Sequence, residues 1–141
     1  MAESRATARW SGSLFEGKGS VAPESGAFSE LPLTWEARTD RPEGSTSPEE
    51  LIAAAHAGCF SMALSNILAK GGNEAESLQT VAQVTFDTKD GPRISKIHLD
   101  VTGTVPGLDQ SGFEEAVSAA KEGCPVSKAL AVDITASGTL A

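Results

Sequence analysis

Basic residues are scarce in this sequence. Eleven Lys and Arg residues stand against nineteen Asp and Glu residues among 141, which leaves a net charge of −8. Proteins that bind DNA, RNA or anionic membranes through charge need a basic surface. The composition therefore argues against nucleic acid and anionic membrane as partners.

Long apolar runs are missing as well. Four polar residues interrupt the most apolar segment, so that no run reaches the roughly 18 residues of a membrane span; they are His56, Ser61, Ser65 and Asn66. The N-terminal segment MAESRATARWSG has neither the basic start nor the apolar stretch of a signal peptide. We therefore expect no membrane span and a cytoplasmic location.

Cysteine is limited to two residues, Cys59 and Cys124. In a reducing compartment, two cysteines are more typical of reduced, catalytic or metal-bound thiols than of a permanent disulfide. Apolar residues make up 40% of the chain and charged residues 21%, which is typical of a globular protein. The length predicts a single domain over residues 1–141.

The N-terminal part predicts a small sheet. Between residues 5 and 38 the short segments RATARW, SGSLFEGKGSVA and LPLTWEAR are separated by Gly, Ser and Pro and show no helical period. We expect two or three antiparallel strands, the last of which ends at Arg38. Residues 39–47 form a polar loop.

A long helix is predicted to begin at Pro48. Ser47 is a suitable N-cap, proline is favoured at the first helical position, and Glu50 completes the pattern of a capping box. Residues 51–70 are apolar on every side of the helix and end at two glycines. Such a helix is typically buried on all sides. A sheet of the same chain would cover one side, and a second copy of the chain would cover the other.

The remainder of the chain alternates strands and helices. Apolar residues alternate with polar ones over residues 81–88 and 94–105, with a turn at 89–93 between these two strands. Asp109 is the predicted N-cap of a helix that runs to Gly123, with a short helical segment and a strand after it. The order of elements predicts an α+β fold.

The two cysteines occupy different local settings. Cys124 precedes Pro125 at a helix start, where backbone N–H groups favour a thiolate. Cys59 follows His56 by three residues and Glu49 by ten, so that all three lie near one side of the helix. A buried cysteine in a helix is nevertheless most often a small apolar residue, and these settings alone leave that alternative open.

Two motifs together resemble a known family. The string SPEELIAAAHAGCFSMALS at residues 47–65, followed by GCPVSKAL at 123–130, is similar to the signature of the OsmC/Ohr family of thiol-dependent peroxidases, in its OsmC branch. The resemblance extends over nearly the whole chain. It implies an OsmC-like α+β fold, in which antiparallel sheets wrap around central buried helices in an intertwined homodimer.

The resemblance also implies roles for individual residues. Cys59 corresponds to the peroxidatic cysteine and Cys124 to the resolving cysteine, while Arg38 and Glu49 correspond to the arginine and glutamate of the family site. Because burial disfavours a thiolate, the permanently charged Arg38 would activate Cys59 and bind the peroxide, and Glu49 would hold the guanidinium. Phe60 and Met62 are expected to line an apolar substrate pocket.

The implied reaction is the reduction of organic hydroperoxides to alcohols in stress and detoxification. A sulfenic acid at Cys59 would condense with Cys124 to a disulfide, which an external dithiol would reopen. The resemblance suggests dihydrolipoamide or a lipoylated protein as that dithiol. No metal and no other cofactor is expected.

Several other interpretations remain open. His56 is best explained as a buried packing residue bonded to one acceptor, and a catalytic base is the minor alternative. His98 is expected in solvent, and Arg41, in the polar loop, is the rival of Arg38.

Two other classes of protein also remain. One is a metal-binding module that uses Cys59, Cys124 and His56, although their spacing lacks the pairs of a closed zinc site. The other is a non-enzymatic structural dimer.

Overall fold

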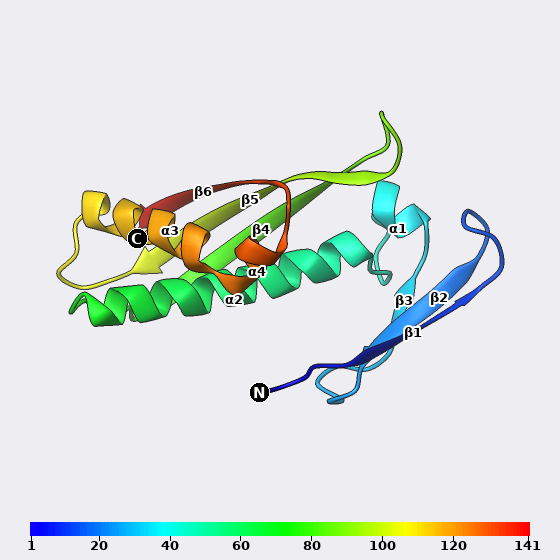
Figure 1. Cartoon of the computed structure of the whole chain (residues 1–141), viewed down its shortest axis with the longest axis horizontal. Coiled ribbons are helices and arrows are strands. Elements are labelled where there is room, and N and C mark those ends of the chain that lie inside the picture. The colour runs from blue at the N-terminus through cyan, green and yellow to red at the C-terminus, as the bar shows by residue number, and fades with distance from the viewer. The chain divides into compact units, whose positions relative to one another are not determined.

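The computed structural model describes residues 1–141 as two compact units, Met1–Leu51 and Ile52–Ala141 (Figure 1). Each unit contains one three-stranded sheet, and helices accompany both. The predicted α+β class is therefore confirmed. The expectation of a single domain stays a prediction.

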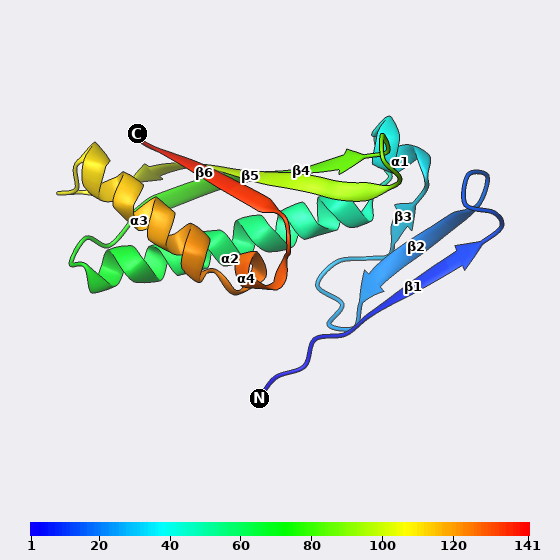
Figure 2. The ribbon, with the colours of Figure 1, turned by 45° about the horizontal axis from the view of Figure 1, so that its top comes forward.

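The first unit is built on a small antiparallel sheet. Its strands are β1 (Ala6–Ser11), β2 (Lys18–Pro23) and β3 (Leu31–Leu33), paired in the order β1-β2-β3 (Figure 2). This is the predicted N-terminal sheet.

The prediction that the last strand continues to Arg38 is wrong. A short helix, α1 (Glu36–Thr39), follows β3, and Arg38 lies on it. The hydroxyl of Thr34 accepts a hydrogen bond from the backbone N–H of Ala37 at 3.1 Å, and such side-chain bonds offer the backbone an alternative to strand pairing. The local hydroxyl therefore favours a helical turn.

Helix α2 (Pro48–Lys70) begins as predicted. The hydroxyl of Ser47 accepts from the backbone N–H of Glu50 at 3.1 Å, which confirms the N-cap. The second half of the capping box is wrong, because the carboxylate of Glu50 accepts instead from the hydroxyl of Thr46 at 2.6 Å. The helix ends where Gly72 adopts a left-handed φ of +88°.

The sheet of the second unit is mixed. Strands β4 (Ser77–Asp87) and β5 (Arg93–Thr104) are antiparallel, as predicted for the hairpin. Strand β6 (Asp133–Leu140) pairs with β5 in parallel, which corrects the expectation of purely antiparallel sheets. The chain reaches this parallel position through a crossover that contains two helices.

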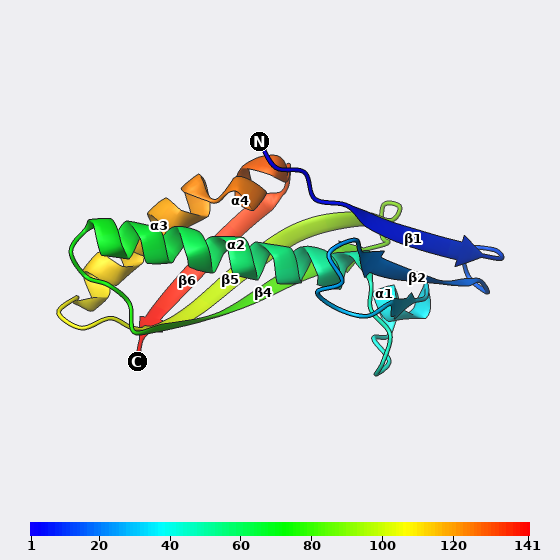
Figure 3. The same ribbon diagram turned by 90° about the horizontal axis from the view of Figure 1, so that it is seen from below.

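The crossover helices are α3 (Gln110–Gly123) and α4 (Pro125–Ala129). The carboxylate of Asp109 accepts from the N–H of Gly112 at 2.8 Å, as expected of an N-cap. Helices α2 and α3 lie on the same face of the sheet of β4, β5 and β6 (Figure 3). This face holds the core of the unit.

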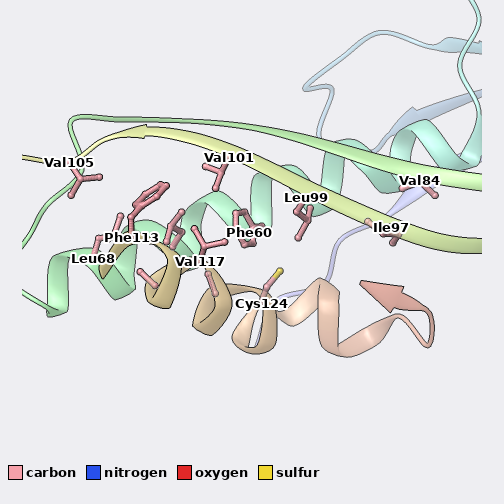
Figure 4. Packing of buried hydrophobic residues seen from close by; sticks show 13 residues of the cluster. Phe60, Leu68, Val84, Ile97, Leu99, Val101, Val105, Phe113, Val117 and Cys124 are labelled. Atoms are coloured by element: carbon pink, nitrogen blue, oxygen red, sulfur yellow. The ribbon is translucent and has the colours of Figure 1, made fainter. Parts of the chain in front are cut away.

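The core fills the space between α2, β5 and α3 (Figure 4). Phe60 of α2, Leu99 of β5 and Phe113 of α3 are completely buried. Gly103 lets the ring of Phe113 lie close to the backbone of β5, because a Cβ at this position would be 2.9 Å from that ring. The predicted inward residues of β5 and α3 are buried or nearly so; they are Ile97, Leu99, Val101, Phe113, Ala116, Val117 and Ala120.

Helix α2 is buried on one side only. The side opposite the core is exposed and carries small side chains and one long one; they are Ala55, Gly58, Met62, Ser65 and Ala69. The expected cover on this side is a second copy of the chain, and that stays a prediction.

By length and composition α2 could cross a membrane. This corrects the expectation that no segment is long and apolar enough to span a membrane. The four polar residues lower the average hydropathy of the 23-residue helix too little to exclude a span. The core helix of a soluble protein passes the same test, so one such helix is weak evidence for a span.

Candidate functional site

The fold brings the two cysteines together. Cys59 lies in the middle of α2, and Cys124 lies at the junction of α3 and α4, where its extended backbone lets Pro125 begin the next helix. Their sulfur atoms are 3.0 Å apart, and both are free thiols. A disulfide requires about 2.05 Å, so the sulfurs need to approach by only about 1 Å to form one.

The two thiols differ in their tendency to ionise. Burial raises the pKa of Cys59 above its ordinary value, and the neighbouring Cys124 thiol adds to this. Burial acts in the same direction on Cys124, but hydrogen bonds from Cys59 and from the backbone and side chain of Ser127 outweigh it, so that the pKa of Cys124 is lowered. This direction agrees with the predicted preference of Cys124 for the thiolate, which stays a prediction.

Buried His56 lies beside the dithiol. Its Nε2 is 2.7 Å from the hydroxyl oxygen of Ser127 on α4, and the ring is completely buried. The interpretation of His56 as a packed residue with one partner is confirmed. Its other ring nitrogen, Nδ1, has no hydrogen-bond partner, and burial lowers the pKa of the ring.

The first unit contains an ion pair between Arg38 and Glu49. The guanidinium donates from Nη2 to Oε1 of Glu49 at 2.7 Å, and from Nε to both carboxylate oxygens at 3.1 and 3.2 Å. The side chain of Glu49 is only 7% exposed, whereas that of Arg38 is 26% exposed. The structure therefore places together the arginine and the glutamate that the sequence singled out.

Two aromatic residues near this ion pair were not identified from the sequence. The guanidinium of Arg38 lies 5.5 Å from the centre of the Trp35 ring, within range of a cation–π interaction. The ring of Phe15 meets Trp35 edge to face at 5.0 Å. The signal for Trp35 was its spacing of three residues from Arg38, which becomes a contact only if the segment is helical.

The two expected substrate-lining residues occupy opposite environments. Phe60 is part of the closed core, with no exposed surface. Met62 is 76% exposed and lines a shallow groove of the second unit, together with Ser61, Ser65 and Leu78. Their role in binding a substrate stays a prediction.

The remaining candidates are placed more simply. Arg41 is exposed in the loop before Pro42, as expected. His98 is not surrounded by solvent alone, because its ring nitrogens bond the hydroxyls of Thr135 at 2.6 Å and Ser137 at 3.2 Å on β6. No group of three or more His, Cys, Asp or Glu side chains is placed to hold a metal ion.

Comparisons with known proteins agree on one family. The family described as "OsmC-like protein" matches residues 41–137. The chain is 46% identical over 129 residues to the peroxiredoxin OsmC of Escherichia coli K12, covering 91% of this chain and 90% of that protein. It is 35% identical over 85 residues to the organic hydroperoxide resistance protein OhrB of Bacillus subtilis, covering 60% of this chain and 61% of that protein.

Solved structures are similar over almost the full length. The crystal structure of Bacillus subtilis OhrB has a TM-score of 0.74 at 26% identity, covering 99% of this chain and 98% of that one. An OsmC-like protein of Vibrio cholerae also has a TM-score of 0.74, at 18% identity, covering 98% of this chain and 99% of that one. The OsmC-like fold predicted from the two motifs is therefore confirmed, whereas the intertwined homodimer stays a prediction.

Proposed function

The chain belongs to the OsmC-like family, and from this premise we propose that it is a thiol-dependent peroxidase that reduces organic hydroperoxides to alcohols. The observation that carries the proposal is the 3.0 Å contact between the sulfurs of Cys59 and Cys124, two residues that are 65 positions apart in the sequence. The names of its relatives, a peroxiredoxin and organic hydroperoxide resistance proteins, support the same reaction and a role in detoxification under stress.

Cys59 is the proposed peroxidatic residue. Its thiolate attacks one oxygen of the hydroperoxide, so that the S–O bond forms as the O–O bond breaks. The departing alkoxide takes up a proton and leaves as the alcohol, and Cys59 becomes a sulfenic acid. Cys59 is partly exposed on α2, which is consistent with access for a peroxide.

Arg38 is the proposed activating cation. Burial raises the pKa of Cys59, and a cation is needed to favour the thiolate again. Arginine is suitable because it remains charged and has several N–H donors for both a sulfur and a peroxide oxygen. Glu49 fixes the direction of those donors, because it accepts hydrogen bonds from Nε and Nη2 of Arg38.

Cys124 is the proposed resolving residue. Its lowered pKa favours a thiolate that can attack the sulfur of the Cys59 sulfenic acid and form a disulfide. An external dithiol then reopens the disulfide by exchange. We propose dihydrolipoamide or a lipoylated protein for this step, in the reducing environment of the cytoplasm.

We further propose that the protein works as a homodimer, with α2 of one copy against α2 of the other. The exposed residues of this helix recur at spacings of three and four, as in a helix–helix seam; they are Ala55, Gly58, Met62, Ser65 and Ala69. At Gly58 nothing lies within 4 Å of the Cβ position, which leaves room for a neighbouring helix. Met62 would pack in this seam or against a substrate.

The dimer has its own test. Met62→Lys should shift the protein from dimer to monomer in sedimentation at micromolar concentration, because the seam would bury a charge. Val81→Lys is the matched control, since Val81 is also an exposed apolar residue but lies on β4. A wild-type protein that sediments as a folded monomer near 14.5 kDa would disprove the dimer.

The peroxidase is tested by single-turnover kinetics with cumene hydroperoxide and by turnover with dihydrolipoamide. Cys59→Ser should abolish peroxide consumption. Cys124→Ser should allow one turnover and accumulate sulfenic acid, which a dimedone-type probe detects. Equal multiple-turnover activity of these two variants would contradict the assigned roles.

The activating arginine is tested in the same assay. Arg38→Ala should slow the first reaction at least about a hundredfold, because both the thiolate and the peroxide contact are weakened. Arg38→Lys should recover only part of the rate, since lysine lacks the planar fork. Arg41→Ala is the control and should remain within a few fold of wild type. A fast Arg38→Ala beside a slow Arg41→Ala would assign the role to Arg41 instead.

A further inference from the structure

Ser127 lies between buried His56 and the dithiol. Nε2 of His56 is 2.7 Å from the hydroxyl of Ser127, which lies three residues after Cys124 on α4 and lowers the pKa of Cys124 by hydrogen bonding. The sulfur of Cys124 is in turn 3.0 Å from that of Cys59. His56 and Ser127 are 71 residues apart, and neither has a part in the reaction proposed above.

The hydrogen bond between His56 and Ser127 can run in either direction. A serine hydroxyl has one proton to donate, and a neutral imidazole has one N–H and one acceptor nitrogen. The tautomer of a histidine is usually set by a bond at its second nitrogen, but Nδ1 of His56 is buried without a partner. Nε2 can therefore donate to Ser127 when Ser127 donates to a Cys124 thiolate, or accept from Ser127 when Cys124 is a thiol.

Oxidation of Cys59 makes the serine hydroxyl more important. In the reduced protein the thiol of Cys59 is one of the donors that stabilise a thiolate at Cys124. Once Cys59 has become a sulfenic acid, that S–H donor no longer exists. The hydroxyl of Ser127 and the backbone N–H groups of Val126 and Ser127 then remain to stabilise a thiolate that is completely buried.

On the basis of the proposed peroxidase function, we propose that Ser127, oriented by His56, is a positioning residue for the resolving half-reaction. It donates a hydrogen bond to the Cys124 thiolate and so determines how fast the disulfide forms. In that step the S–S bond forms and the S–O bond of the sulfenic acid breaks. Hydroxide leaves with the electron pair of the broken S–O bond. It then combines with the proton that Cys124 released earlier, so that the net product is water.

Few titratable groups lie near Cys124 and His56. The thiol of Cys59, on α2, is the titratable side chain that faces Cys124. The pKa of His56 is lowered by burial alone, so that no charged side chain acts on it. A change in the pH dependence of disulfide formation on mutation of Ser127 therefore reports on Cys124 or on His56, and the His56 variants separate the two.

The test separates the two half-reactions. One equivalent of cumene hydroperoxide is mixed with the full-length reduced protein, and sulfenic acid and disulfide are followed in time by quenching and mass spectrometry between pH 5 and 9. Ser127→Ala should form the sulfenic acid at the wild-type rate and then form the disulfide about tenfold more slowly at pH 7. Its pH midpoint for disulfide formation should rise by about one unit, because a hydrogen bond to a charged group is lost.

Three further variants distinguish a positioning role from a structural one. Ser127→Thr keeps the hydroxyl and should restore the wild-type pH midpoint. His56→Gln keeps a donor toward Ser127 and should be impaired less than His56→Leu. Ser61→Ala removes a hydroxyl of α2 that bonds Thr80 at 2.7 Å instead of a cysteine, and it should resolve at the wild-type rate.

The outcomes are distinct. If wild type forms no sulfenic acid and no disulfide, the proposed function fails. If wild type forms both, and Ser127→Ala forms its disulfide with an unchanged rate and pH midpoint, the role of Ser127 is overturned. A slow Ser127→Ala that retains the wild-type pH midpoint, or a Ser127→Thr variant that is equally slow, would also overturn it, because loss of packing would then explain the effect.

Discussion

Removal of Arg38 should destabilise the protein less when Glu49 is neutralised at the same time. The side chain of Glu49 is 7% exposed, and its carboxylate accepts three bonds from the Arg38 guanidinium, at 2.7 to 3.2 Å. Arg38→Ala leaves this carboxylate charged and without that partner. We therefore expect the double variant Arg38→Ala/Glu49→Gln to be more stable than Arg38→Ala alone.

The magnitude follows from the burial of the pair. Loss of one partner of a buried ion pair costs about 3–5 kcal/mol, and solvent at the 26%-exposed side chain of Arg38 reduces this to about 2–3 kcal/mol. A neutral amide left without a partner costs about 1–2 kcal/mol. The double variant should thus recover about 1 kcal/mol of the free energy of unfolding relative to Arg38→Ala.

Urea unfolding followed by tryptophan fluorescence measures this difference, because the Trp35 ring lies 5.5 Å from the guanidinium. Both variants should consume hydroperoxide equally slowly, as neither has the cation. A double variant no more stable than Arg38→Ala at pH 7 would refute the reasoning, and Arg41→Ala should stay within about 0.5 kcal/mol of wild type.

Three further expectations follow from the fold. Phe60→Ala should lower the free energy of unfolding by about 3–5 kcal/mol in urea, because Phe60 is completely buried; a loss below 1 kcal/mol would show that the core is loosely packed. Gly103→Ala should cost about 1–3 kcal/mol, since its methyl group would lie 2.9 Å from the Phe113 ring, whereas Gly123→Ala, with nothing within 4 Å, should cost nothing in the same experiment. Burial lowers the pKa of His56 from 6.5, so the unfolded chain binds more protons between that lowered value and 6.5, and stability should decrease as pH falls through this range. In thermal unfolding between pH 7.5 and 5, His56→Gln should lose this part of the pH dependence, and an unchanged dependence would assign it to other groups.

The sequence by itself determined the elements whose causes are local. The N-cap at Ser47, the proline that begins α4 after Cys124, and the alternation along β5 each depend on residues a few positions apart. Local patterns of this kind survive in any tertiary context that does not oppose them. The two cysteine motifs likewise predicted the family and the reaction before any geometry was known.

Local reasoning failed where two local preferences competed. Arg38 was expected at the end of a strand, but the Thr34 hydroxyl binds the backbone of Ala37 and stabilises a helical turn. The carboxylate of Glu50 was expected to bond Ser47, but the Thr46 hydroxyl is its partner. In both cases a nearby threonine hydroxyl provided the alternative hydrogen bond.

Only the tertiary structure decided which distant residues meet. The parallel pairing of β6 with β5 depends on the crossover through α3 and α4, which no local pattern encodes. The same crossover brings Cys124 to Cys59 over 65 positions and Ser127 to His56 over 71. The sequence identified the cysteines through their motifs. The Ser127 hydroxyl meets His56 only when α4 packs beside α2, because side chains 71 positions apart in the chain are brought within hydrogen-bond distance by packing alone.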